Sequence, residues 1–407
     1  MGFAWNRAIE RCAARAASFD LCYDTLIRLV SGEYRKIKMT DGRSAGGQRI
    51  RSLTTRGIMV PLKFTLGTSA AIVKAVPLLL VDLLNEDGVT GRAYAFCYRP
   101  SGAVAISSHL FEAVDLLKGK DSTPFDAAQT LSRQFALLGV TGTVRMALSL
   151  LDMAMWDAIA QIQRIPLSSL LGSSPKPLRA YDSRGLGLME PDRLAEETKT
   201  LLESGLGAVK LRLGYPSLSE DMAALNAVRR SISRGDIEIM VDYNQALTSA
   251  EAILRGRELE KEGIYWLEEP IAHEDYEASA AVARELKVPL QIGENFNGPE
   301  GLLRAISVQA SDYVMADVAR IGGVTGWLHA AGVAAAHGIE ISSHLMPEIS
   351  THLLCATPTA HWLEYVDWAD AIIEEPLKIR DGMVLTSKRT GSGIAWDEAK
   401  LKRLAAI

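Results

Sequence analysis

Cysteine is scarce in this chain of 407 residues, and it follows no functional pattern. The four cysteines, Cys12, Cys22, Cys97 and Cys355, show neither a CxxC motif nor the spacing of metal ligands. We interpret them as reduced thiols. A signal peptide is not evident either, since the N-terminus lacks a continuous apolar core and a small-residue cleavage site. Together these features predict a protein of the reducing cytoplasm.

Long apolar runs and an excess of positive charge are also lacking. No run reaches the ~18 residues of a membrane helix, and the best candidate, Ile72–Leu84, is interrupted by Lys74, Pro77 and Asp82. The net charge is −5, from 44 basic and 49 acidic residues, which is untypical of a nucleic-acid binder. No Gly-rich loop opens a helix as in phosphate-binding motifs. We therefore expect neither a membrane nor a nucleic acid as partner, and we disfavour phosphorylated substrates.

The first segment differs in charge from the rest of the chain. Residues 1–56 carry 11 Lys and Arg against 5 Asp and Glu, and Ser44–Gly47 is typical of a linker. We expect residues 1–48 to be a basic extension that is disordered, or an over-long start whose true first residue is Met39. The alternative is a targeting or membrane-surface role, because Met1–Val30 has the pattern of a basic amphipathic helix.

Residues 49–178 have the pattern of an α+β domain. Strands are predicted at Ile50–Phe64, Val76–Leu84 and Gly91–Tyr98, and turn residues at Asn85–Gly88 join the last two into a hairpin. Most of 104–166 is predicted to be helical, because apolar residues recur there at a spacing of three to four.

From residue 179 to about 370, strand-like and helical segments alternate. Eight such strands at about 25 residues per unit predict an α/β fold, a TIM-type (β/α)8 barrel whose last helix is questionable. The loops must be short in so compact a barrel, so residues 49–178 are expected to cap its mouth. The predicted strands are Arg179–Leu186, Ala208–Gly214, Ile237–Asn244, Ile264–Pro270, Val288–Asn295, Asp312–Ala319, Ile339–Leu345 and Trp362–Asp367.

Acidic residues close three consecutive strands. Asp242, Glu268 and Glu294 are spaced 26 and 26 residues apart, one in each unit. In a barrel they converge at the carboxyl-terminal rim, where three negative charges repel one another unless a cation neutralises them. Oxygen ligands without His or Cys favour Mg²⁺ over zinc. The pattern therefore predicts a magnesium site.

Basic and acidic groups flank that trio. Lys210 and Arg212 share one face of the second strand, because residues two apart on a strand point the same way. His344 closes the seventh strand, and Asp317 on the sixth is placed to orient its imidazole. Glu364 lies on the eighth strand, where a neutral acid could donate a hydrogen bond to an oxyanion. This set suits abstraction of a proton next to a carboxylate, with the enediolate stabilised by the metal and these groups.

Specific stretches of the chain resemble the enolase superfamily, and within it the mandelate racemase subgroup. The stretches are VKLRLGYP at 209–216, VDYNQ at 241–245, WLEEP at 266–270, IGGVTGW at 321–327, SSHL at 342–345 and ATPTAHWLE at 356–364, with Gly293–Asn295. The resemblance covers the chain from about Ile50 onward. It implies a modified (β/α)7β barrel at 179–370, an α+β capping domain at 49–178 and a segment, 371–407, that returns to the capping domain.

The resemblance also implies roles for the site residues. It assigns Mg²⁺ to Asp242, Glu268 and Glu294, the base to His344 with Asp317, carboxylate contact to Lys210 and an electrophilic role to Glu364. A small-molecule carboxylate is the expected partner, and we also expect a homo-oligomer. The substrate's carboxylate and α-hydroxyl are assigned to Ser183 and Asn244, and its far end to Leu66, Ala70, Val73, Tyr98 and Val366.

One position departs from the family pattern. Arg212 stands where the racemase has a second lysine that serves as the base for one enantiomer, and arginine is a poor base. The mostly apolar far end nevertheless favours a mandelate racemase-like racemase or epimerase acting on a 2-hydroxycarboxylate. The alternative is an acid-sugar dehydratase with His344 as its single base, and a third hypothesis is a metal-binding homologue without turnover.

Overall fold

The computed structural model describes residues 47–69, 71–233, 235 and 237–407 of the chain. The helix expected at Met1–Val30, the alternative start at Met39 and the pocket residue Ala70 lie outside the described residues.

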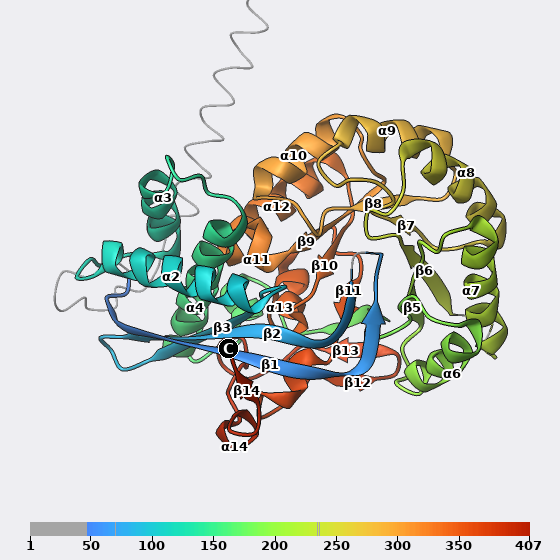
Figure 1. The fold of residues 1–407 in the computed structure, drawn as a ribbon. Coiled ribbons are helices and arrows are strands. Elements are labelled where there is room, and N and C mark those ends of the chain that lie inside the picture. Colours follow the sequence, from blue (N-terminus) through green and yellow to red (C-terminus); the bar gives the residue numbers. More distant parts are fainter. Residues whose placement is uncertain (1–46, 70, 234, 236) are drawn as a thin grey trace, which may run out of the picture. The chain divides into compact units, whose positions relative to one another are not determined.

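The described part of the chain begins with three long strands that pair in an antiparallel sheet (Figure 1). In its core, Leu78 and Leu80 are fully buried on the central strand. At the far end of the first hairpin, Leu66 lies opposite Val73, after an irregularity in the register. The three strands are β1 (Ile50–Gly67), β2 (Ile72–Asn85) and β3 (Thr90–Phe96).

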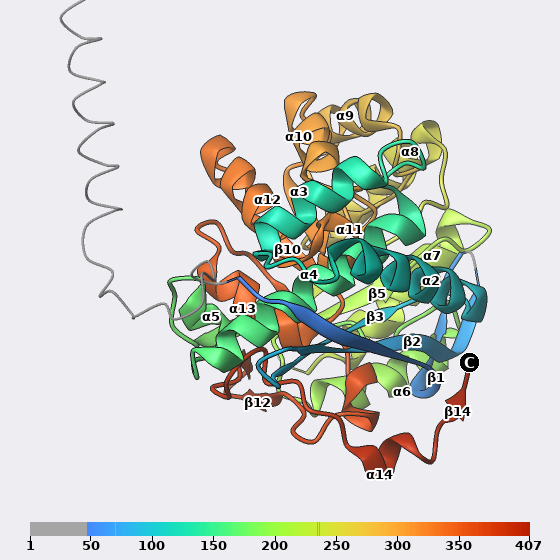
Figure 2. The same cartoon turned by 90° about the vertical axis from the view of Figure 1, so that its left-hand side faces the viewer.

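Three helices follow this sheet, α2 (Pro100–Leu117), α3 (Pro124–Gln134) and α4 (Gly142–Ile162). Proline at the first turn starts α2 and α3, where its missing N–H has no helical partner to lose. The helix α4 is apolar around much of its circumference and is therefore buried, between β3 and helices of the second half of the chain. Figure 2 shows α2, α3 and α4 in front of the later part of the chain.

Parallel strands then alternate with helices, as the sequence predicts. The order of pairing from β10 through β4 follows the order in the chain, and β11 pairs with β4. A backbone hydrogen bond of 3.0 Å also joins Ser343 on β10 to Trp362, next to β11. The domain is thus barrel-like (Figure 1). Its strands are β4 (Pro177–Asp182), β5 (Ala208–Arg212), β6 (Glu238–Asp242), β7 (Leu267–Glu268), β8 (Leu290–Ile292), β9 (Tyr313–Asp317), β10 (Ile341–His344) and β11 (Leu363–Tyr365).

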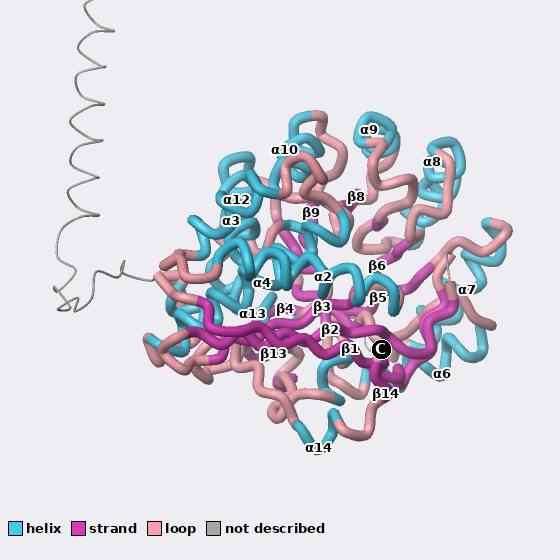
Figure 3. Tube along the Cα trace, turned by 60° about the vertical axis from the view of Figure 1, so that its left-hand side comes forward, coloured by secondary structure: helices cyan, strands magenta, loops and turns pink. Residues whose placement is uncertain are grey.

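Helices surround these strands on the outside, as Figure 3 shows. Two of them begin with a capping box, Ser217 with Glu220 and Thr248 with Glu251, in which side chain and backbone satisfy each other's first-turn donors. The helices are α5 (Leu167–Leu170), α6 (Pro191–Leu202), α7 (Leu218–Ser231), α8 (Ser249–Leu259), the 3-10 turn η1 (Glu260–Glu262), α9 (Tyr276–Glu285), α10 (Pro299–Ser307), α11 (Val318–Ile321), α12 (Gly323–His337), α13 (Pro347–Ala356) and the 3-10 turn η2 (Trp368–Ala371).

The last part of the chain contacts both sheets. The hairpin of β12 (Lys378–Arg380) and β13 (Met383–Leu385) pairs with β4, whereas β14 (Ala405–Ala406), after α14 (Glu398–Leu401), pairs with β1. Residues Gly46–Ile407 form one compact unit. Within the described residues, no helix has the length and apolar character needed to cross a bilayer.

Candidate active site

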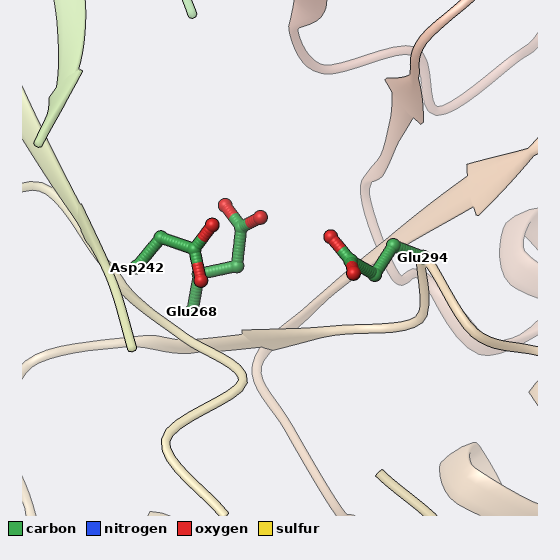
Figure 4. A group of neighbouring side chains, drawn as sticks. All are labelled: Asp242, Glu268 and Glu294. Carbon is green, nitrogen blue, oxygen red and sulfur yellow. The ribbon is translucent and has the colours of Figure 1, made fainter. Parts of the chain in front are cut away.

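Three carboxylates meet at the carboxyl ends of neighbouring strands. Asp242 ends β6, Glu268 ends β7, and Glu294 follows β8 after Gly293, whose φ of 126° turns the chain. One oxygen from each lies within 4.8 Å of the others. In Figure 4, Asp242 and Glu268 lie side by side, and Glu294 points toward them from the opposite side. The trio predicted from the 26-residue spacing is therefore assembled.

The donor set of this trio fits Mg²⁺. All three ligands are carboxylate oxygens, the ligand type that Mg²⁺ takes in proteins, and one oxygen from each lies within 4.8 Å of the others. Burial raises the pKa of Glu268 to about 8, even though Lys210 lowers it, and the charges of Asp242 and Glu294 add to the rise. Such mutual repulsion between buried acids is relieved by a divalent cation.

Lys210 lies in the middle of the acids. Its Nζ is 2.7 Å from Glu268, 2.9 Å from Glu364 and 3.4 Å from Asp242, and the side chain is buried. Burial alone lowers the pKa of Lys210, but the acids around it raise that pKa well above its ordinary value. Lys210 is therefore a fixed positive charge beside the trio.

His344 faces the trio from β10 and is held by Asp317 of β9. Nδ1 lies 2.8 Å from the Asp317 carboxylate, and Nε2 lies 3.3 Å from Glu294. Burial alone lowers the pKa of His344. The charges of Glu294 and Glu364, with the Asp317 hydrogen bond, raise it to about 9. The pair expected from the sequence is thus brought together, with Nε2 directed to the site.

Glu364 differs from the expectation of a neutral acid. It accepts hydrogen bonds from Ser183 Oγ at 2.7 Å and from the Leu345 N–H at 2.8 Å, in addition to its ion pair with Lys210. Burial alone raises the pKa of Glu364, but Lys210 and His344 lower it to a net value below the ordinary range. In this arrangement Glu364 is an ionised acceptor, because each of these three neighbours donates to it.

Arg212 is buried, and its guanidinium is held by the chain. Nη1 donates to the Gly185 carbonyl at 2.8 Å, and Nη2 donates to Ser183 Oγ at 3.0 Å. Ser183 therefore bridges Arg212 and Glu364. The position on β5 that faces the site is thus occupied by a cation that is committed to neighbouring oxygens.

The remaining predicted pocket residues fall into two groups. Asn244 lies beside the metal trio, donates to Asp242 at 2.9 Å and keeps a buried Oδ1 without a partner. Leu66 and Val366 are buried, and Val73 is half-buried opposite Leu66 in the β1–β2 hairpin. The end of that hairpin reaches the second sheet, since Ser69 Oγ donates to the Asn244 carbonyl at 3.0 Å.

Tyr98 lies in a cleft of about 1090 Å³ between the capping elements and the barrel-like domain. Its ring lies tilted against that of Phe96, at a centroid distance of 4.3 Å and an interplanar angle of 40°. The guanidinium carbon of Arg320 lies 4.6 Å from the centre of the Tyr98 ring. Tyr98, which the resemblance assigns to the far end of the substrate, is therefore paired with a cation, Arg320, that was not predicted from the sequence.

Two residues beside the site were not predicted from the sequence, Glu269 and Arg320. Glu269 is buried and binds Asn295 Nδ2 at 2.8 Å, which holds the loop carrying Glu294. The adjacent acids Glu268 and Glu269 were the available signal in the sequence. Neighbouring residues of a strand point to opposite faces, which argues against both reaching the site. The chain turns at Glu269, where φ is 32°, so this alternation does not apply to it. For Arg320, the signal was its position three residues after Asp317, one helical turn away.

Two family models match most of the chain. The mandelate racemase / muconate lactonizing enzyme N-terminal domain matches residues 51–172, and the enolase C-terminal domain-like family matches residues 193–400. The chain belongs to the enolase superfamily, in its mandelate racemase subgroup. The recognition made from the sequence motifs is confirmed.

Relatives within the superfamily differ in their reactions. L-talarate/galactarate dehydratase of Salmonella typhimurium is 32% identical over 325 residues, which are 79% of this chain and 81% of the enzyme. A Bradyrhizobium enolase solved with magnesium and mandelic acid is 37% identical, with a TM-score of 0.84 over 89% of this chain and 99% of its own. An L-talarate/galactarate dehydratase variant with magnesium and L-glucarate is 29% identical, with a TM-score of 0.82 over 92% and 97%.

These comparisons and the acid trio confirm the predicted cofactor, Mg²⁺. The coarse reaction is likewise established as the magnesium-dependent proton abstraction of the superfamily. The neighbours bind small carboxylates, mandelic acid in one case and L-glucarate in the other.

Proposed function

We propose that this enzyme dehydrates an acid sugar, with His344 as its single base. The observation that carries the proposal is the placement of Arg212, whose guanidinium donates to Gly185 and Ser183, because arginine is a poor general base. His344 is then the group suited to abstract a proton, once bound Mg²⁺ offsets the Glu294 charge that raises the pKa of the imidazole. The relation to L-talarate/galactarate dehydratase supports the same choice over the racemase favoured from the sequence.

The proposed chemistry uses the groups around the trio in turn. Bound Mg²⁺ supplies positive charge for the substrate carboxylate. Lys210 adds a fixed positive charge on the β5 side, which favours the electron density that the carboxylate gains when the α-proton leaves. His344 Nε2 takes that proton, with Asp317 holding the imidazole in place.

Elimination completes the proposed reaction. The electron pair from the broken C–H bond forms a double bond to the β-carbon as the β-hydroxyl leaves. The protonated His344 returns its proton to the leaving oxygen, so water departs, and the remaining enol becomes a 2-keto acid. One residue thus serves first as base and then as acid, and no proton acceptor on the opposite face is needed.

The proposal extends to the architecture. We infer that β4–β11 close into a (β/α)7β barrel through β11, that residues 49–178 cap it and that 371–407 join the two parts. The β11–β4 pairing and the hydrogen bond between Ser343 and Trp362 support closure. The contacts of β14 with β1 support the return of the chain.

A racemase remains the second candidate. The Bradyrhizobium neighbour with bound mandelic acid supports it, as do the buried apolar side chains of Leu66 and Val366 near the hairpin. Racemisation requires a proton acceptor on each face of the α-carbon. Arg212, or a group near it, would therefore have to act as the second base.

One experiment separates the candidates. The enzyme is incubated with Mg²⁺ in D₂O, separately with a panel of acid sugars and with each enantiomer of mandelate, and with His344→Asn as control. Formation of a 2-keto acid by wild type, lost in the variant, is the expected result. Exchange and loss of optical rotation on mandelate, without any 2-keto acid from the sugars, would instead establish the racemase.

A further inference from the structure

A layer of mostly aromatic side chains lies beneath the site, toward the amino ends of the strands. Each member precedes a site residue by two positions, and residues two apart along a strand point to the same side. Trp266 thus lies under Glu268, and Trp362 lies under Glu364. The layer packs as a buried cluster apart from the main core, and it consists of Tyr181, Ala208, Met240, Trp266 and Trp362.

The polar atoms of this aromatic layer differ in their partners. Trp266 Nε1 donates to Glu268 Oε2 at 3.1 Å. Trp362 Nε1 and the Tyr181 hydroxyl are buried and have no hydrogen-bond partner among the described residues. Trp266 is therefore the member of the layer whose N–H contacts a metal ligand.

Glu268 has a donor on each of its two oxygens. Lys210 Nζ donates to Oε1 at 2.7 Å, and Trp266 Nε1 donates to Oε2. The carboxylate cannot rotate about its last bond without losing one of these hydrogen bonds, yet each oxygen keeps a further lone pair for a cation. The two donors together therefore fix the orientation of this ligand.

The other two metal ligands receive hydrogen bonds from loops of the rim. Asp242 accepts from the backbone and side chain of Asn244 at 2.7 and 2.9 Å, and Glu294 lies 3.3 Å from Asn295 Nδ2. Both asparagines lie beyond the carboxyl ends of their strands. Glu268 is held instead from the strands and the layer beneath them, so its placement is independent of those loops.

Burial strengthens the bond between Trp266 and Glu268. Both side chains are fully buried, and the Trp266 ring packs edge-on against Tyr181 at a centroid distance of 5.4 Å. Glu268 is ionised when it binds a metal. A hydrogen bond to an ionised carboxylate is stronger than a neutral one, and more so where water is excluded.

We propose that Trp266 is a positioning residue of the magnesium site, whose indole N–H holds the carboxylate of Glu268 in place for the metal. Trp266 acts through Glu268 and not on the substrate. The inference concerns Mg²⁺ binding, so it holds whether the enzyme is a dehydratase or a racemase.

Titration calorimetry with Mg²⁺ on the metal-free, full-length protein tests the proposal, with Trp266→Phe compared against Trp362→Phe. Each substitution removes a buried indole N–H from the same layer and keeps an aromatic ring, but only the Trp266 N–H has a metal ligand as acceptor. Trp266→Phe should weaken Mg²⁺ binding about 10- to 100-fold, whereas Trp362→Phe should leave it nearly unchanged. Thermal unfolding shows whether each variant is folded.

Equal losses of Mg²⁺ affinity in the two variants would show that the layer acts only through packing. That result, or an unchanged affinity of Trp266→Phe, would overturn the proposal. If Trp266→Phe does not fold, the indole N–H resonances of the ¹⁵N-labelled wild type decide the question. One of them should be displaced both by Mg²⁺ and by Glu268→Gln, and the proposal fails if none responds to both. Turnover enters neither measurement, so the proposed reaction is tested separately.

Discussion

Arg212 is the residue whose chemistry separates racemisation from one-base dehydration. Wild type should exchange the α-proton of only one of two α-epimers with solvent, because only His344 accepts protons. Arg212→Lys places a group of adjustable pKa at the position where the racemase of the subgroup has its second base, at the cost of the contacts to Gly185 and Ser183. Exchange of the second epimer should then rise at least about tenfold.

Proton NMR in D₂O on each epimer separately measures this exchange, with His344→Asn as the control that loses exchange of the first. Similar rates for both epimers in wild type would mean that Arg212, or a group near it, already acts as a base. The one-base proposal would then be wrong.

Glu268 tests the metal trio. Glu268→Gln removes one anionic ligand and the nearest partner of Lys210, and it should weaken Mg²⁺ binding by roughly tenfold or more. Titration calorimetry with Mg²⁺ measures the change. Glu274→Gln, an equal charge change on an exposed side chain of the same domain, is the control, and an equal effect of both substitutions would reject the site.

A buried acid, Asp152, lies where helices α4 and α12 meet, and its pKa differs between the folded and unfolded states. Asp152 of α4 accepts hydrogen bonds from the backbone and hydroxyl of Thr325 in α12. Burial raises its pKa to about 7 from an ordinary 3.8, although Thr325 opposes the rise. The folded state therefore binds the Asp152 proton more tightly than the unfolded state does. The contribution of this proton to the free energy of unfolding is fully present below about pH 4, and it is lost as the pH rises from there through 7.

Asp152→Asn should remove this dependence. Wild type should lose roughly 1.4 kcal/mol of unfolding free energy per pH unit from this group between about pH 4 and pH 7, and the variant should be flatter by that slope. Urea unfolding across this range measures both. Parallel curves for the two proteins would show that Asp152 stays ionised in the folded state.

Element boundaries show what the sequence pattern predicts and what it misses. The alternation of strands and helices located each expected barrel strand, but the observed strands are shorter, as in β7, where Ile264–Pro270 was expected and Leu267–Glu268 is observed. The chain leaves the ladder at polar residues such as Asn244 and Glu269, whose φ values are positive. Apolar periodicity has no signal for such turns, although they aim the site side chains.

At the scale of the whole molecule, the metal trio and the His344–Asp317 pair could be predicted because the barrel topology brings strand ends together. The partners of Arg320 and Arg212 could not, because they depend on contacts between distant segments. Tyr98 reaches Arg320 only because β3 packs against the second domain through α4. The pKa of Glu364 depends in the same way on four separate neighbours, Lys210, His344, Ser183 and Leu345.

The N-terminal limit of the fold gives the last prediction. The first described contacts are the bridge between Gln48 and Ser122 and the hydrogen bond from Gln48 to the Met155 carbonyl, and Ile50 is the first core side chain. A chain beginning at Met39 keeps all of them, so it should unfold at the same temperature and turn over like the full chain. A chain beginning at Ser52 loses all of them, including a buried isoleucine worth about 1.5–3 kcal/mol, and should unfold several degrees lower. Calorimetric melting and turnover of the three proteins compare them directly. A Met39 chain that is insoluble or inactive would show that residues before it belong to the fold, and the basic extension would need a structural or targeting role.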